Sequence, residues 1–182
     1  MTQTSSSIGY SLWFIPDEPE ATQCTNLIHD LAPKHNGVLF PPHITLVPDI
    51  FPPTSVSTNE VEVRCEKIIN AVLPSSTSFT IPFICAATGT VYYRCVYALC
   101  EKVPIIMELN KQLQQEFGYN NDYMPHLSFL YSDISNEERE KICTEIQPKV
   151  KDIQKVKIKA IELWDTTGRP PVWKCLKTWK LV

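Results

Sequence analysis

Two stretches of the chain share one pattern, Pro42-His43-Ile44-Thr45-Leu46-Val47 and Pro125-His126-Leu127-Ser128-Phe129-Leu130. Each contains a proline, a histidine, an apolar residue, a threonine or serine, and an apolar tail. The β-branched and apolar residues favour a strand in both stretches. Because side chains alternate across a β-strand, the histidine and the hydroxyl residue of each stretch point to the same face. The apolar residues between them therefore point into the core.

Outward from these stretches, strand and helix patterns alternate along the chain. Apolar and β-branched runs predict strands over residues 8–15, 37–47, 77–86, 90–100, 124–131, 153–164 and 172–181. Helical spacing of apolar residues predicts helices over 20–32, 61–72 and 104–117, and a capping-box pattern from Ser135 to Glu138 predicts a fourth. The fold class is α+β, and the two histidine stretches form a weak internal duplication.

The size and charge of the chain limit its organisation and its partners. At 182 residues and 20.8 kDa, with no shift in composition along the chain, residues 1–182 are expected to form a single domain. The net charge of −3 argues against a stable nucleic-acid partner, because coating nucleic acid requires clustered positive charge. The chain has only 5 glycines and no glycine-rich phosphate loop. A small ligand and a monomeric state are expected.

The cysteines and the apolar runs indicate a cellular compartment. The 7 cysteines form no CxxC pair and no cluster with histidine at zinc spacing, so we expect packing cysteines and no metal or other cofactor. A disulfide stays possible, although the sequence does not identify a pair. The polar start of the chain resembles no secretory signal, and no apolar run reaches the roughly 18 residues of a membrane span. We expect a cytoplasmic protein with no membrane partner.

Two imidazoles and two hydroxyls on one surface suit the hydrolysis of a phosphodiester. One neutral imidazole can take a proton from an attacking water, and one imidazolium can protonate the departing oxygen. The hydroxyls can donate hydrogen bonds to the non-bridging oxygens, where negative charge develops in the transition state. This chemistry requires no metal ion. The residues concerned are His43, Thr45, His126 and Ser128.

At these residues the chain resembles the two-histidine phosphoesterase superfamily, and within it the cyclic phosphodiesterases of plants and fungi. The resemblance includes the opening strand at Tyr10-Ser11-Leu12-Trp13, both histidine stretches, the segment Tyr93-Arg94-Cys95-Val96-Tyr97 and Tyr131. It implies two pseudo-symmetric lobes, each an antiparallel sheet flanked by helices, with the active-site cleft between them. It also implies catalysis by the four residues named above.

The resemblance implies a substrate class as well. The family hydrolyses nucleoside 2′,3′-cyclic phosphates and ADP-ribose 1″,2″-cyclic phosphate, a by-product of tRNA splicing, and ring opening leaves the phosphate on the 2′ oxygen. Pseudo-symmetry makes the two histidines nearly interchangeable. We favour His126 as the base that activates water and His43 as the acid, with Thr45 and Ser128 holding the phosphate.

Other residues have both a functional and a structural interpretation. Tyr131 is a candidate to line the mouth of the cleft, or is an ordinary tyrosine at a strand end. Arg94, expected in the middle of a strand, is a candidate phosphate or ribose contact, or a half-exposed strand residue. Trp13 either stacks on a base or packs in the core. His29 and His35 have no serine or threonine two residues later and are expected to be structural.

Two further functions use the same residues. An RNA-processing enzyme of the same type would act on cyclic-phosphate RNA ends or 2′–5′ linkages, but a large RNA substrate favours a basic rim around the cleft. A nucleotide-binding module without catalytic activity is the other alternative. The intact histidine and hydroxyl of both stretches argue against it.

Overall fold

The chain runs twice through the order strand, helix, strand, helix, strand. In the computed structural model, which describes residues 9–53 and 55–182, the first run comprises β1 (Tyr10–Pro16), α1 (Glu20–Leu31), β2 (Ile44–Ile50), α2 (Thr58–Val72) and β3 (Phe79–Thr88). The second comprises β4 (Val96–Cys100), α3 (Pro104–Glu116), β5 (His126–Leu130), α4 (Asn136–Ile153) and β6 (Lys155–Asp165), and is followed by β7 (Lys174–Lys180). The internal duplication thus extends to the whole order of elements.

Six antiparallel strands close into a ring. Their order is β1-β2-β5-β4-β3-β6, β6 pairs back onto β1, and β7 lies on the outer edge of β6. The two antiparallel sheets predicted from the sequence can be followed as β2–β1–β6 and β5–β4–β3. Hydrogen bonding continues across both junctions between them, β2–β5 and β3–β6, so the sheets form one closed barrel rather than two separate lobes.

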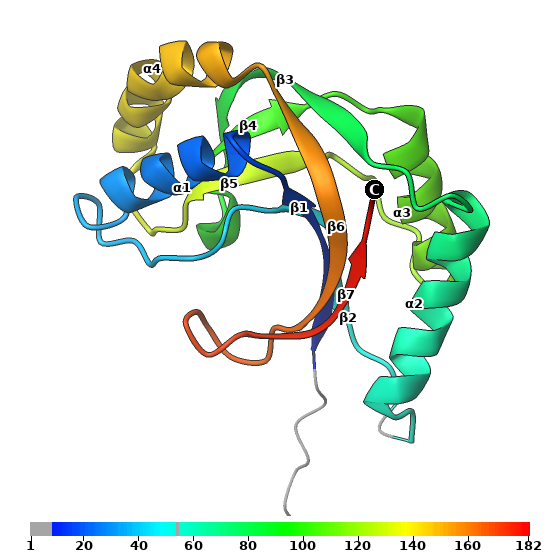
Figure 1. Cartoon of the computed structure of the whole chain (residues 1–182). Coiled ribbons are helices and arrows are strands. Elements are labelled where there is room, and N and C mark those ends of the chain that lie inside the picture. Colours follow the sequence, from blue (N-terminus) through cyan, green and yellow to red (C-terminus); the bar gives the residue numbers. More distant parts are fainter. Residues whose placement is uncertain (1–8, 54) are drawn as a thin grey trace, which may run out of the picture.

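The helices lie outside the strands in two pairs. Figure 1 shows α1 and α4 on one side of the barrel and α2 and α3 on the other. The serines Ser57 and Ser135 cap α2 and α4, each accepting a hydrogen bond from the backbone N–H three residues later, so the helix start predicted at Ser135 is confirmed. The Glu138 carboxylate, which would complete a capping box, contacts His35. Within residues 9–53 and 55–182, no helix is long and apolar enough to cross a membrane.

The predicted alternation in the two histidine stretches is confirmed. The apolar residues of both stretches are fully buried: Ile44, Leu46, Leu127 and Phe129 each have 0% of their surface exposed. They join a single hydrophobic core beneath the helices. All seven cysteines are free, and four of them are buried.

Two predicted strands have different bounds in the structure. The strand expected over 37–47 begins only at Ile44, because Pro41 and Pro42 lack the N–H groups that a sheet ladder needs. The strand expected over 90–100 begins at Val96, and residues Tyr92–Arg94 form a short 3-10 helix, η1. Pairing of β3 with β4 begins at Thr88 and Val96, so the residues between them are used for the chain reversal.

Gly89 lies where this reversal is tightest, and its replacement provides a test. A Cβ atom there would lie 2.3 Å from the carbonyl oxygen of Arg94, a backbone atom that cannot move without displacing η1. We expect Gly89→Ala to lower the free energy of unfolding by about 1–3 kcal/mol, as overpacking does, measured by urea denaturation. The exposed neighbour Thr90 supplies the control, because Thr90→Ala should change stability by less than about 0.5 kcal/mol. Equal stability of the two variants would contradict the expected clash.

Candidate active site

A cavity of about 510 Å³ opens beside the junction of β2 and β5. It is lined by the six residues of the predicted site, His43, Thr45, Arg94, His126, Ser128 and Tyr131, and also by Trp13. The six predicted residues come from β2, β5 and the segments next to them, and are separated by up to 88 positions in the chain. The fold therefore brings the two histidine stretches to one site.

One residue pair determines how the two stretches face each other. Ile44 is the antiparallel partner of Leu127, and this is the pairing between β2 and β5. In antiparallel register His43 then lies opposite Ser128, and Thr45 lies opposite His126. Since Ile44 and Leu127 point into the core, their four neighbours share the other face. The two imidazoles occupy one diagonal of this square and the two hydroxyls the other.

Both histidines are oriented by the same local hydrogen bond. Nδ1 of His43 lies 2.7 Å from the carbonyl oxygen of Pro41, and Nδ1 of His126 lies 3.0 Å from that of Met124, in each case two residues earlier. A carbonyl oxygen only accepts, so each Nδ1 carries the proton and donates it. The Nε2 lone pair of each neutral ring is thereby left for chemistry in the cavity.

His43 is buried in an aromatic stack. Its ring lies flat on Trp13, with 3.6 Å between the ring centroids and 10° between the planes. On its other face Trp13 stacks on Trp164 at 4.4 Å. Trp13 is 2% exposed and also lines the cavity, so its position fits both of its sequence interpretations. Burial lowers the pKa of His43 from 6.5 to about 4, the hydrogen bond to Pro41 opposes this, and the charge of His126 adds to it.

His126 has different neighbours. It is half-buried at the start of β5, and the ring of Tyr97 meets it at a 64° angle, 5.1 Å away. Burial lowers the pKa of His126 as well, with the hydrogen bond to Met124 acting against the shift and the positive charge of Arg94 adding to it. Both imidazoles are therefore neutral in the free protein at pH 7.

The hydroxyl residues are held by β2, β5 and their surroundings. The Ser128 hydroxyl donates to the carbonyl oxygen of Tyr93 at 3.1 Å. Thr45 is half-buried, and its carbonyl oxygen accepts a hydrogen bond from the Tyr123 hydroxyl at 3.0 Å. Burial raises the pKa of Tyr123 well above its ordinary value, so this phenol remains a donor. The backbone that carries the Thr45 side chain is thus fixed from the side of β5.

Tyr131 lies deeper than the sequence suggested. It was expected near the mouth of the cleft, but only 4% of its surface is exposed and its ring stacks on Phe40 at 3.7 Å. Its hydroxyl donates to Nε2 of His43 at 3.4 Å. Burial raises the pKa of Tyr131, so the hydroxyl keeps its proton. Tyr131 therefore contacts a candidate catalytic group directly.

Arg94 lines the cavity from the η1 turn rather than from the middle of a strand, where it was predicted. Its Nε atom is buried and has no hydrogen-bond partner among residues 9–53 and 55–182. This atom packs beside Gly89, whereas the residue as a whole lines the cavity, where a guanidinium can donate charge-assisted hydrogen bonds to an anion. This position suits contact with a phosphate group.

Sequence reasoning missed several residues of the cavity wall. Trp173, in the loop between β6 and β7, lines the cavity beside Tyr93, and their ring centroids lie 5.7 Å apart. On the opposite wall, Asn110 of α3 donates from Nδ2 to the carbonyl oxygen of Leu46 at 2.7 Å. Only the single asparagine among the apolar positions of a helix was a possible signal for Asn110. The sequence held no such signal for Trp173, because this residue follows a turn that was expected only to connect two strands.

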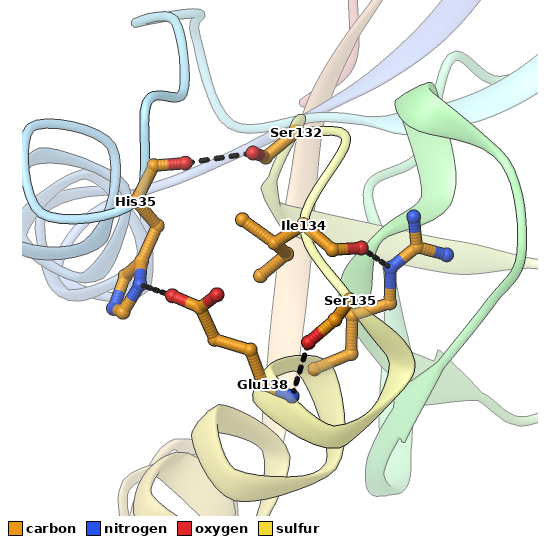
Figure 2. A network of polar contacts seen from close by, with 6 residues as sticks. His35, Ser132, Ile134, Ser135 and Glu138 are labelled. Carbon is orange, nitrogen blue, oxygen red and sulfur yellow. Dashed lines mark hydrogen bonds and ion pairs between the residues drawn. The ribbon is translucent and has the colours of Figure 1, made fainter.

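The other two histidines lie outside the cavity, as the structural interpretation predicted. His29 is exposed on α1. Figure 2 shows His35, which donates from Nδ1 to Glu138 at 2.8 Å, while its carbonyl oxygen accepts from the Ser132 hydroxyl at 2.7 Å. This network joins the end of α1 to the start of α4. Because Ser132 follows Tyr131 in the chain, it also anchors Tyr131 from outside the cavity.

Comparison with known sequences identifies the family. The sequence profile of the family described as cyclic phosphodiesterase-like protein matches residues 8–182. The chain belongs to this cyclic phosphodiesterase-like family. It is 28% identical over 132 residues to the cyclic phosphodiesterase of Arabidopsis thaliana, a match that covers 71% of this chain and 68% of the relative.

Two further similarities agree with this family membership. The chain is 29% identical over 143 residues to the 2′,3′-cyclic-nucleotide 3′-phosphodiesterase of Yarrowia lipolytica, covering 76% of this chain and 64% of the longer relative. The crystal structure of E. coli LigT in apo form has the same fold, with a TM-score of 0.61 at 12% identity over 98% of this chain and 99% of LigT. The cyclic phosphodiesterase-like family and this fold place the chain in the two-histidine phosphoesterase superfamily.

The buried neutral state of His43 predicts how stability depends on pH. The pKa of His43 is about 4 in the folded protein and 6.5 when exposed, so below pH 6.5 the unfolded chain binds a proton that the folded chain does not. Stability should therefore fall as the pH decreases from 6.5 to 4, with His43 contributing about 2–3 kcal/mol to the loss. Urea denaturation at several pH values measures this. The slope should be shallower in His43→Gln and unchanged in the surface variant His29→Gln; an unchanged slope in His43→Gln would contradict a buried neutral His43.

Proposed function

We propose that this protein hydrolyses small cyclic phosphates, opening nucleoside 2′,3′-cyclic phosphates to 2′-phosphates and acting on ADP-ribose 1″,2″-cyclic phosphate in the same way. The observation that carries the proposal is the square of two imidazoles and two hydroxyls around the Ile44–Leu127 pair. Membership of the cyclic phosphodiesterase-like family supports it. The cavity of about 510 Å³ and the net charge of −3 favour a small substrate over a long RNA.

The diagonal arrangement of the imidazoles suits an in-line displacement at phosphorus. Side chains on the diagonal of an antiparallel pair stand about 7–8 Å apart, which leaves room for a phosphate between the rings. The attacking and departing oxygens lie on opposite sides of phosphorus, and each then faces one Nε2. The two hydroxyls, on the other diagonal, face the non-bridging oxygens. Ser128 would exchange its bond to the Tyr93 carbonyl for one to the substrate.

The proposed hydrolysis adds one water across the bond from phosphorus to O3′. A water oxygen forms a bond to phosphorus, and His126 as the base takes the proton that the water loses. The bond from phosphorus to O3′ breaks, and His43 as the acid supplies the proton that O3′ gains. Because both rings are neutral in the free protein, the acid must gain its proton together with the substrate. The negative charge of a bound phosphate diester favours this by stabilising a neighbouring imidazolium.

Arg94 and Tyr131 complete the proposed site. The guanidinium of Arg94 would donate to the phosphate or to a ribose oxygen. Tyr131 would exchange its contact with His43 Nε2 for a substrate oxygen as the ring becomes protonated, since a phenol both donates and accepts. Acid, base and phosphate donors are then all side chains of this chain. We therefore propose a metal-independent reaction, and a link to the by-products of tRNA splicing through the ADP-ribose substrate.

The substrate and the absence of a metal requirement can be tested in one experiment. The purified protein is incubated with each nucleoside 2′,3′-cyclic phosphate and with ADP-ribose 1″,2″-cyclic phosphate, in excess EDTA, and the products are identified by phosphorus NMR. We expect turnover in chelator, with 2′-phosphates as the products of the nucleoside substrates. Complete loss of activity in EDTA that a divalent ion restores would disprove the metal-independent mechanism. Formation of 3′-phosphates would disprove the assigned leaving group.

Substitution of the four residues separates proton transfer from phosphate binding. His43→Ala or His126→Ala should lower kcat/KM by about 10²–10⁴-fold, and Thr45→Ala or Ser128→Ala by about 10²–10³-fold. The double histidine variant should lose far less than the product of the two single losses, because the pair acts as a unit. His29→Ala, on an exposed face of α1, is the control and should retain normal turnover. Normal kcat/KM in a folded His43→Ala or His126→Ala protein would rule out this assignment.

A further inference from the structure

The closed barrel repeats its backbone in both halves, but it does not repeat what surrounds the two histidines. On the His43 side, three rings are stacked in the order His43, Trp13, Trp164, with centroid distances of 3.6 and 4.4 Å. On the His126 side, the aromatic neighbour Tyr97 meets the imidazole at a steep angle. The Arg94 guanidinium also acts on His126 with a positive charge.

The Trp13 ring is fixed in the orientation that presents its face to His43. Its indole N–H donates to the Ser11 hydroxyl at 2.8 Å, and Ser11 in turn donates to the carbonyl oxygen of Val47 at 3.2 Å. Trp13 and Ser11 are 2% and 5% exposed. Trp164 blocks movement away from His43 on the other face. The indole therefore cannot rotate without breaking this buried chain of hydrogen bonds.

The face of an indole ring is electron-rich and attracts a cation placed over it within about 6 Å. A neutral imidazole gains little from this attraction, whereas an imidazolium gains much more. The stack thus favours the protonated form of His43, against the effect of burial. The titratable groups that face His43 are His126 on β5 and the Tyr131 phenol just beyond it. Arg94 has the opposite effect on His126, since a neighbouring positive charge favours the neutral ring.

We propose that Trp13 is a positioning residue that selects His43 as the acid of the reaction, by holding its ring flat and stabilising its imidazolium form. This inference rests on the proposed function for the acid role itself. Trp13 acts through His43 and need not touch the substrate. The indole face at His43 and the guanidinium near His126 then counteract the deeper burial of His43, and so favour proton donation from His43 in a pseudo-symmetric site.

The pH dependence of kcat tests this role, because kcat reports the pKa values of the enzyme–substrate complex, in which the acid has gained its proton. The acid must be protonated there, so its pKa sets the alkaline limb of the profile, and loss of the indole face should lower that pKa. We expect Trp13→Leu to move the alkaline limb to lower pH by about one unit, while Trp13→Phe, which retains an aromatic face, restores much of the shift. Trp179→Phe, a buried tryptophan on β7 away from the cavity, is the matched control and should leave both limbs in place. A shift of the acid limb instead, or a uniform loss of kcat with both limbs unmoved, would overturn the proposal.

A second measurement tests the stack in the absence of catalysis and without a change in shape. Stepwise fluorination of the indole at position 13 withdraws electrons from the ring face but preserves packing. NMR titration of His43 with saturating inorganic phosphate should then show its pKa falling with each added fluorine, and that of His126 nearly constant. If no cyclic phosphate is hydrolysed, this titration still decides the effect of Trp13 on His43, so failure of the proposed function and failure of the inference are distinguishable. A His43 pKa that does not respond to fluorination would overturn the inference.

Discussion

The antiparallel pairing of Ile44 with Leu127 is the constraint on which the site depends. A slip of one residue in either strand would turn its histidine and hydroxyl into the core and its apolar residues into the cavity. The barrel has a pseudo-twofold relation through this pair. Exchange of β1 with β4, β2 with β5 and β3 with β6 maps the ring of strands onto itself. The two histidine stretches are thus equivalent positions of a duplicated unit, and they meet where the two copies join.

This junction is thin, and side chains reinforce it. β2 and β5 share one residue pair, whereas β4 pairs with β5 at four positions. Beyond the pair, successive carbonyl oxygens of β2 accept hydrogen bonds from side chains, Thr45 from Tyr123 and Leu46 from Asn110. Gln114 joins the two supports, because it donates to Asn110 and both donates to and accepts from the backbone of Asn121. The strands diverge here, which leaves the space for a ligand, while the segment leading to His126 stays tied to β2.

The sequence predicted what depends on local periodicity and failed where distant segments meet. The alternation around His43 and His126 was readable because strand period and burial follow directly from residue type. The predicted start of β2 was too early, because the apolar residues before Pro41 resemble a strand. In the structure the strand begins only after two prolines, which lack the N–H groups that a sheet ladder needs. The residues of the 3-10 turn that contains Arg94 resemble a strand in composition. They form a turn instead, because the chain must reverse there between β3 and β4. Closure of the two sheets into one barrel depends on the β2–β5 and β3–β6 pairings between distant segments, for which no local pattern exists.

The same distinction explains why the sequence left the acid and base roles nearly interchangeable. A duplicated backbone gives each histidine the same carbonyl partner two residues earlier, so local geometry orients both rings alike. Hydrolysis nevertheless needs one neutral and one protonated imidazole, and a symmetric environment would favour neither arrangement. The difference must come from residues that the duplication does not match. Trp13 lies on β1, beside β2 in the ring, and Trp164 lies on β6, on the far side of β1, whereas Arg94 enters from the turn before β4. Because the duplicated backbone places the two histidines alike, the proposed acid and base roles have to be assigned by side chains that pack differently around each of them.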